Sequence, residues 1–375
     1  MKYDPAPREC AKRTDLHLLN NIQFLRFVAA ALVVVAHGAI APFGLPIEFY
    51  NTGRFGVDVF FVISGFIIPY ILFGGSHTEI SKVKLSGWAF FIRRLARIWP
   101  MYFIVTMLVL ACAYIVGSGW FKPNPDLAFA YNSAKLDINL LFESLTFTHS
   151  FIAPTLNVGW TLQFEFMFYT IIATLLIVGV KRLESFIIST AAIMLISYLI
   201  LNSTAKSYLG WIAPVKLIGS PMMFEFLFGL ILYRIHSAGV HLARIPSIII
   251  LAISIPLLLT VQLNNLIPSL NGQAFYRPIV WGSLAFLMVW AALSLEGIYS
   301  PPKFFVLLGD ASYSLYLIHW ILMPWIAHFF DTLGLYSLGV VFFYLVYFAI
   351  CQGAAIILHL YVEKPINTAI RKHIN

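Results

Sequence analysis

Residues 21–38 read NIQFLRFVAAALVVVAHG, an apolar run that contains one cation, Arg26, and one imidazole, His37. Eleven residues separate the two side chains, so a helix with about 100° and 1.5 Å per residue places both on one face, roughly 16 Å apart. An ionisable group inside a bilayer is costly and commonly functional. The stretch therefore predicts a polar track through a membrane bundle, unless Arg26 snorkels to the surface and His37 is a packing residue.

The composition of the whole chain supports a membrane protein. Of the 375 residues, 60% are hydrophobic and 11% are charged, whereas a soluble domain has about 25% charged residues. We therefore expect an all-α polytopic membrane protein, whose net charge of +8 marks cytoplasmic loops and does not indicate nucleic-acid binding. Three scattered cysteines and the lack of a metal-ligand pattern predict neither a disulfide framework nor a metal site.

Ten apolar segments are long enough to cross a bilayer, so we predict a bundle of about ten transmembrane helices. With the N-terminus inside, 18 of the 24 Lys and Arg residues fall on the cytoplasmic side, which predicts that both termini are cytoplasmic. The predicted spans are 22–41, 57–73, 98–117, 159–180, 185–201, 212–233, 246–262, 278–295, 304–327 and 336–360.

Residues 138–154 are apolar enough to touch the membrane, but they contain Glu143. Counting them as a span would reverse the charge asymmetry downstream, so we interpret them as a re-entrant or interfacial segment. We expect one membrane domain, residues 21–365, between cytoplasmic tails at residues 1–20 and 366–375.

Arg94 and Arg97 precede Trp99 and Pro100 and lie three residues apart, so they are neighbours on one helix face. Guanidinium groups match phosphate oxygens in geometry and charge. The pair therefore indicates either a phosphate-binding site at the mouth of the bundle or ordinary cytoplasmic flanking charge.

Two carboxylates fall near the outer ends of apolar segments. Glu165, about six residues into its span, is near the depth of His37, so the two are predicted to form a general-base pair unless Glu165 is a neutral structural group. Asp58 is either an acid favoured at a helix N-terminus or a group that orients a nearby basic group. As a catalytic candidate, either Glu165 or Asp58 would stabilise the imidazolium that forms on His37. For Ser64 and Gly65 the pattern favours helix packing.

Other side chains in the apolar segments are candidates for contacts with substrate. Trp160 and Tyr169 fit this role, although both also suit interfacial or core positions. His319 follows a run of small polar residues that favours helix packing. We interpret Glu225 and Glu363 as structural.

These stretches together resemble the membrane acyltransferase 3 family of bacteria, in its exopolysaccharide-acetylating (ExoZ-type) branch. In order from residue 21 to about residue 365, the resemblance rests on Arg26-x10-His37, FGVDVFFVISGF, Arg94-x-x-Arg97 with Trp99–Pro100, GWTLQFEFMFY and GDASYSLYLIHW.

By this resemblance, His37 is the catalytic residue and shares a motif with Arg26. Arg94 and Arg97 take part in handling the acyl donor, and Arg26 is predicted to bind it with them by continuing their positive track inward. Glu165 is the glutamate of the family's Trp–Glu block. The family implies an O-acyltransferase in the inner membrane that moves an acetyl group from cytoplasmic acetyl-CoA to a hydroxyl of a cell-surface or extracellular glycan. Membrane lipids and polysaccharide-assembly proteins are the other implied partners.

Two other classes remain open from the residues alone. A transporter of a lipid-linked sugar or small molecule also has broken helices and intramembrane charges, but no inverted repeat is visible and the arginines cluster at one mouth. An inactive component of a polysaccharide assembly would retain the fold, but the intact motif residues argue against it.

Overall fold

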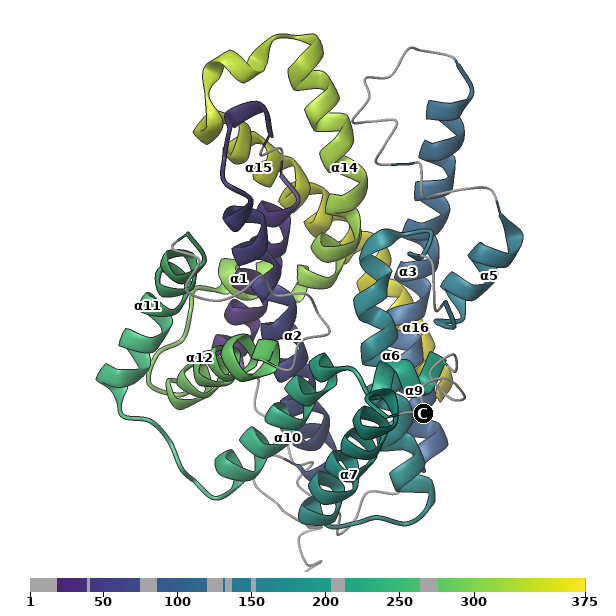
Figure 1. Cartoon of the computed structure of the whole chain (residues 1–375), viewed down its shortest axis with the longest axis vertical. Helices are drawn as coiled ribbons and strands as arrows, with labels where there is room; N and C mark the ends of the chain where they lie inside the picture. The colour runs from purple at the N-terminus through teal and green to yellow at the C-terminus, as the bar shows by residue number, and fades with distance from the viewer. Residues whose placement is uncertain are drawn as a thin grey trace, which may run out of the picture.

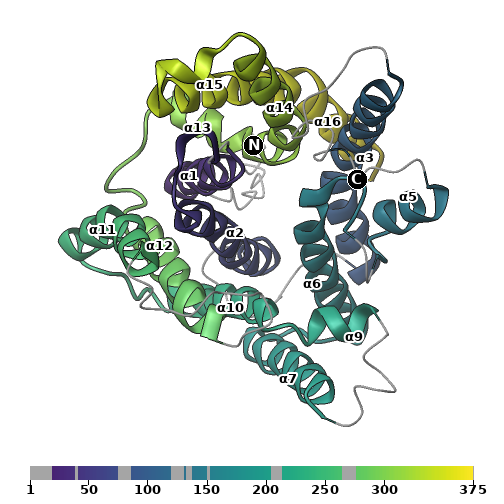
Figure 2. The same cartoon turned by 45° about the horizontal axis from the view of Figure 1, so that its top comes forward.

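Helices α1 (Asn20–Ala36) and α2 (Ile47–Phe73) pack side by side in the middle of the bundle (Figures 1 and 2). The structure is a computed structural model, and the part that it describes is helical and contains no strand. Residues 1–18 of the predicted tail at residues 1–20 lie outside the described part. The described residues are 19–38, 41–74, 86–119, 131, 137–149, 153–203, 213–263 and 276–374.

The other helical elements surround this central pair. In chain order they are η1 (Ala41–Phe43), α3 (Gly87–Gly117), α5 (Ile138–Leu145), η2 (Asn157–Gly159), α6 (Trp160–Ile177), α7 (Leu183–Leu201), α9 (Ala213–Ile218), η3 (Pro221–Met223), α10 (Phe224–Ser237), α11 (Arg244–Leu263), η4 (Pro278–Gly282), α12 (Ser283–Ser294), α13 (Lys303–Asp310), α14 (Ser312–Thr332), η5 (Leu335–Leu338), α15 (Val340–Leu358), η6 (His359–Glu363) and α16 (Lys364–Ile374).

Figure 2 shows the central pair α1 and α2 with α10, α11 and α12 on one side. Helices α13 to α15 lie on another side of this pair, and α3 with α6 lie on a third. α1 packs against α2, α13 and α14, whereas α6 packs against α3 and α7. The order of helices in space therefore separates α1 from α6, although both belong to the predicted catalytic machinery.

The all-α membrane class is confirmed, but the number of spans is not. Among the residues that the structure describes, six helices are long and apolar enough to cross a membrane, and α13 with α14 adds a seventh if this pair, bent by 63°, counts as one span. The helices at Asn20–Ala36 and Pro278–Ser294 are apolar but shorter. Each of the ten predicted segments coincides with helix, but several are broken or too short to count as spans by themselves.

Within residues 138–154, α5 has eight residues and thus a length of about 12 Å, far less than the roughly 30 Å of a bilayer core. It lies beside α3: the indole of Trp99 donates to the Leu145 carbonyl at 3.0 Å, and the Tyr102 hydroxyl donates to the Ser144 carbonyl at 3.3 Å. The helix in this segment is therefore too short to cross a bilayer by itself, and the re-entrant or interfacial placement of 138–154 stays a prediction.

Small residues allow α2 to approach both of its neighbours closely. A Cβ atom added at Gly56 would overlap the carbonyl oxygen of Ala29 on α1, and one added at Gly65 would overlap the carbonyl oxygen of Phe226 on α10. Gly65 therefore serves helix packing, as the sequence pattern favours. These contacts place α1 and α2 at a separation that larger side chains would not permit.

Gly56→Ala is expected to destabilise the protein by about 1–3 kcal/mol, because the added methyl group meets rigid backbone and must force the two helices apart. Gly353→Ala is the matched control, since a Cβ atom at that helical glycine meets nothing within 4 Å. Thermal unfolding of the purified variants in detergent checks this prediction. Equal melting temperatures for the two variants would show that α1 and α2 are not in close contact.

Candidate active site

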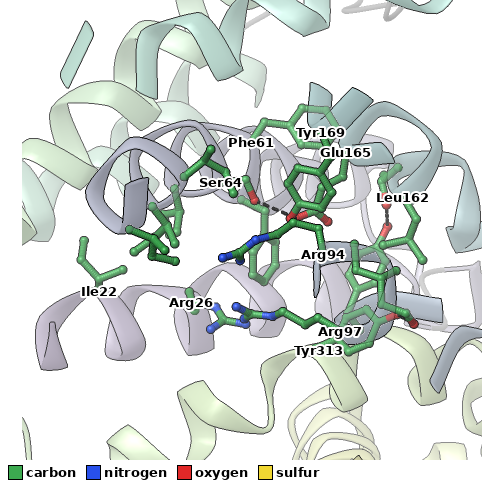
Figure 3. A pocket seen from close by; sticks show the side chains of 18 of the residues that line it. Ile22, Arg26, Phe61, Ser64, Arg94, Arg97, Leu162, Glu165, Tyr169 and Tyr313 are labelled. Carbon is green, nitrogen blue, oxygen red and sulfur yellow. Dashed lines mark hydrogen bonds between the residues drawn. The ribbon is translucent and has the colours of Figure 1, made fainter. Parts of the chain in front are cut away.

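Five helices, α1, α2, α3, α6 and α14, enclose a cavity of about 270 Å³ (Figure 3). On α2 its lining runs from Val57 to Ile71, about 21 Å along the helix axis. Leu19, the residue before α1, lines the end near Ile71, whereas Thr161 and Tyr316 line the other end. The cavity is thus elongated along the helices. Much of its remaining wall is apolar and includes Ile22, Phe60, Phe61, Ile63, Ile67, Ile68 and Leu162.

Three arginines direct their guanidinium groups into this cavity: Arg26 from α1, and Arg94 and Arg97 from α3 (Figure 3). Arg94 and Arg97 share one face of α3, as their spacing predicted. The Nη1 group of Arg26 donates a 3.1 Å hydrogen bond to the side chain of Gln23, one turn earlier on α1. Three converging guanidinium groups make the cavity suitable for a ligand with several phosphate oxygens.

Side-chain oxygens accept hydrogen bonds from the first backbone N–H groups of both arginine-bearing helices. α3 starts at Ser86, whose hydroxyl accepts a 3.1 Å hydrogen bond from the backbone N–H of Ala89. α1 lacks such a cap, and the backbone N–H groups of Asn21 and Ile22 donate instead to the carboxylate of Glu296, at 2.8 and 3.3 Å. A residue from the turn after α12 therefore supplies the hydrogen-bond acceptor at the start of α1.

Glu165 also lines the cavity, and its carboxylate accepts hydrogen bonds from the hydroxyl of Tyr169 and, at 3.0 Å, from that of Ser64. The predicted pairing of Glu165 with His37 is absent from the structure. The depth count located Glu165 along its own helix, but α6 packs against α3 and α7, not against α1. Glu165 thus shares the arginine-lined cavity, and His37 does not line it.

His37 lies next to a second histidine, His319 of α14. Its Nδ1 atom is 2.9 Å from the carbonyl oxygen of Val33 and 3.3 Å from Nε2 of His319. His319 is fully buried, and its Nδ1 atom is 3.0 Å from the carbonyl oxygen of Leu315. The rings of Tyr50 and Trp320 meet the His37 ring edge-on, at centroid distances of 5.9 and 5.2 Å.

The hydrogen-bond network assigns the tautomers of both rings. A carbonyl oxygen only accepts, so Nδ1 of His319 carries its proton and Nε2 of His319 is an acceptor. Nδ1 of His37 must then be the donor toward Val33 and His319, which leaves Nε2 of His37 with a free lone pair. A neutral imidazole held in this way is able to accept a proton or to act as a nucleophile through Nε2.

Tyr316 connects the cavity with the histidine pair. It lines the far end of the cavity, and its ring centroid is 6.0 Å from that of His319. Its hydroxyl lies 2.6 Å from the hydroxyl of Thr161 and donates to the carbonyl oxygen of Val158 at 3.0 Å. One end of the arginine-lined cavity therefore reaches the side chain that packs against His319.

Asp58 pairs with a basic group, as one of its two interpretations predicted, but this group is Arg277 and not His37. Both of its carboxylate oxygens accept hydrogen bonds from Arg277, from Nε at 3.1 Å and from Nη2 at 3.0 Å, and both side chains are almost fully buried. The Arg277 guanidinium also stacks over the Trp281 ring at 4.7 Å. The carboxyl group of Glu225 is buried beside this pair. Asp58 thus belongs to a buried ion pair outside the cavity. This pair could not be predicted, because the sequence around Asp58 carried no information about Arg277.

Trp160 does not line the cavity and packs edge-on against Phe164, with ring centroids 5.9 Å apart. Ser64 and Tyr316 line the cavity, although neither was predicted as a site residue. Ser64 was interpreted as a packing residue, and nothing local to it indicates a bond to a helix a hundred residues away. Tyr316 had a usable signal, since it lies three residues before His319 and hence on the same helix face.

The sequence profile of one protein family, described as "Acyltransferase domain" (Acyl_transf_3), matches residues 19–360. The chain is 30% identical over 272 residues to "Exopolysaccharide production protein ExoZ" of Rhizobium meliloti (strain 1021), covering 72% of this chain and 76% of that protein. It is 27% identical over 334 residues to "Putative O-acetyltransferase SACOL0978" of Staphylococcus aureus (strain COL), covering 84% of this chain and 52% of that protein. The chain thus spans about half the length of the staphylococcal relative. No solved structure matches the chain.

The family profile covers the helices that build the arginine-lined cavity and those that carry both histidines. Its activity, acyl transfer, also agrees with a polar cavity inside an otherwise apolar bundle. This protein therefore belongs to the Acyl_transf_3 family of acyltransferases and is a membrane enzyme that transfers acyl groups.

Proposed function

We propose that the enzyme moves an acetyl group from acetyl-CoA on the cytoplasmic side to a hydroxyl group of a cell-surface or extracellular glycan. The observation that carries this proposal is the cavity itself, in which three arginines lie at one place and Tyr316 links the far end to His319. The cavity offers a phosphate-binding region, and the histidine pair behind Tyr316 offers a basic imidazole; acyl transfer from a phosphorylated thioester needs both groups.

The donor is proposed to bind with its phosphates at Arg26, Arg94 and Arg97. Coenzyme A combines a phosphorylated nucleotide with a long and thin pantetheine arm. A cavity that extends about 21 Å along α2 and has largely apolar walls suits such an arm. Arg26 stands roughly 16 Å along α1 from His37, so an arm that follows the helix axis would bring the thioester toward the histidine pair.

His37 is proposed to act as the base. Its Nε2 atom takes the proton of the acceptor hydroxyl while the oxygen attacks the thioester carbonyl, and the departing thiolate then receives that proton. His37 acylated at Nε2 is the covalent variant of the same scheme. In both, the Nδ1–H group of His37 points at Nε2 of His319, so His319 stabilises the positive charge that develops on the ring. His319 takes over the role that the sequence analysis gave to Glu165 or Asp58.

Glu165 is proposed to hold the wall of the donor site, through its bonds to Ser64 and Tyr169. The glycan acceptor follows from the printed name of the ExoZ relative, an exopolysaccharide production protein, and from the O-acetyltransferase name of the staphylococcal relative. The positive-inside asymmetry supports an inner-membrane location with cytoplasmic tails at 1–20 and 366–375 around the domain 21–365. Proteins of polysaccharide assembly are the proposed partners.

Donor binding tests this proposal through the double variant Arg94→Ala/Arg97→Ala. A hydrogen bond to a charged group contributes about 1.5–3 kcal/mol, so loss of the pair is expected to weaken acetyl-CoA binding by more than about a hundredfold. The measurement is titration calorimetry on purified protein in nanodiscs, together with release of free thiol from acetyl-CoA. Wild type is expected to show slow thiol release that the double variant loses.

Arg93→Ala is the matched control, because Arg93 is adjacent in sequence but exposed and absent from the cavity lining. It removes one positive charge from the same helix, half of what the double variant removes, and is expected to leave donor binding within about twofold of wild type. If well-folded wild-type protein binds no acetyl-CoA, or if Arg93→Ala weakens binding as much as the double variant, the proposed donor site is wrong.

A further inference from the structure

A second cavity, of about 440 Å³, lies between α1, α11 and α12, on a different face of α1 from the one that bears Arg26. Its lining is almost entirely apolar. Polar side chains occur only where α1 and α11 begin and α12 ends, namely Asn21, Arg244 and Tyr299. The apolar part is lined by Phe24, Leu25, Val28, Ile248, Leu251, Ala252, Ile255, Met288, Ala292 and Leu295.

The apolar lining follows the helices away from the polar end. From Asn21 to Val28 it extends about 10 Å along α1, and from Arg244 to Ile255 about 16 Å along α11. The outer surface of α11 exposes apolar side chains such as Ile249 and Ile253, about half of whose surface is accessible, so this helix faces lipid. The groove therefore runs along α1 and α11 at an edge of the bundle whose outer surface is apolar.

Arg244 is the only charged residue that lines the groove in the described part of the chain. It is exposed, and none of the ion pairs among the described residues involves it. The nearby polar groups already have partners: the Asn21 amide donates to the Tyr299 carbonyl at 3.0 Å, and the Glu296 carboxylate accepts from the N–H groups of α1. Arg244 therefore has its charge available at the polar end.

We propose that this groove binds one anionic phospholipid, with its phosphate at Arg244 and an acyl chain along the apolar wall. The charge and the lining complement the two parts of such a molecule, since an exposed guanidinium attracts an anionic headgroup and the groove accepts a hydrocarbon chain. In the proposed topology, the lipid belongs to the cytoplasmic leaflet. It would fill the space between α11 and α1, the helix that carries Arg26 and His37, and so support the helix on which the acyltransferase site depends.

The test compares dioleoyl phosphatidylglycerol with dioleoyl phosphatidylcholine, each added to delipidated protein in detergent. Native mass spectrometry is expected to show one retained phosphatidylglycerol at about fivefold higher occupancy than phosphatidylcholine, and thermal unfolding is expected to shift upward with phosphatidylglycerol alone. Arg244→Gln is expected to abolish the preference. Ala252→Trp, which fills the groove, is expected to remove retention of both lipids.

Arg234→Gln is the matched control, because the Arg234 side chain is 43% exposed but pairs with Glu184 at 3.0 Å and does not line the groove. It is expected to keep the preference for phosphatidylglycerol. Equal retention of both lipids by wild type, or an unchanged preference in Arg244→Gln, would overturn the proposal. So would a change of oligomeric mass in Ala252→Trp, which would identify a second copy of the chain as the occupant.

Discussion

Replacing His37 with alanine is expected to abolish acyl transfer while the protein remains folded and inserted. A positioned general base contributes about 10²- to 10⁴-fold to a rate, and a covalent role for the same nitrogen would make the loss greater. The measurement is transfer of a radiolabelled acetyl group to a glycan acceptor, with thermal unfolding as the check on folding. Donor binding is expected to persist, because His37 does not line the arginine cavity.

Substitution of His319 tests whether this residue positions and stabilises His37 in the reaction. His319→Leu removes the acceptor that faces Nδ1 of His37 at 3.3 Å and is expected to lower the rate by about ten- to a hundredfold. It is also expected to change the pH dependence of the rate, since the ring of His37 loses the neighbour that stabilises its charged form. In the double variant His37→Ala/His319→Leu no further loss is expected beyond that of His37→Ala, because the two side chains act as one unit.

His328→Ala is the control for this series, since His328 is on α14 like His319 but lies two turns beyond it and outside the site. It is expected to retain the wild-type rate. Acyl transfer that survives in folded His37→Ala protein would refute the assignment of the base. A rate in His319→Leu equal to wild type, with the same pH dependence, would show that the histidine contact has no part in the reaction.

Asp58→Ala is expected to be strongly destabilising, by about 3–5 kcal/mol. It leaves the buried guanidinium of Arg277 without its partner, and an uncompensated charge in the interior is costly. The side chains of Arg277 and Asp58 are 1% and 0% exposed, so neither water nor lipid headgroups would replace the lost bonds. The measurement is the melting temperature of purified protein and the yield of inserted protein.

The matched control is Glu184→Ala, which breaks the ion pair between Arg234 and Glu184. That pair has the same 3.0 Å distance, but its side chains are 43% and 51% exposed, so its loss is expected to cost about 1 kcal/mol or less. If Asp58→Ala and Glu184→Ala lowered the melting temperature equally, the Asp58–Arg277 ion pair would not be buried as described. Folded Asp58→Ala protein that binds acetyl-CoA but transfers no acetyl group would instead restore the catalytic role for Asp58.

The sequence by itself determined the class of the protein and the positions of its helices along the chain. Hydropathy and helical period act over neighbouring residues, so they were sufficient for the all-α membrane class and for the shared face of Arg94 and Arg97. The order of five motifs was sufficient to identify the family, and the match over residues 19–360 confirms this identification. Arg26, which was predicted to continue the positive track of Arg94 and Arg97, lines the same cavity as these two arginines of α3.

Only the tertiary structure decided which side chains meet across helices. The depth of Glu165 in its span did not predict that its partners are Ser64 and Tyr169, nor did the position of Asp58 predict Arg277. The reason is that the choice of neighbouring helix depends on close contacts between segments far apart in the chain, such as those that small residues of α2 make with α1 and α10. Periodicity gives the axial position and the face of each side chain, but the helix that lies opposite is determined by the packing of the whole bundle.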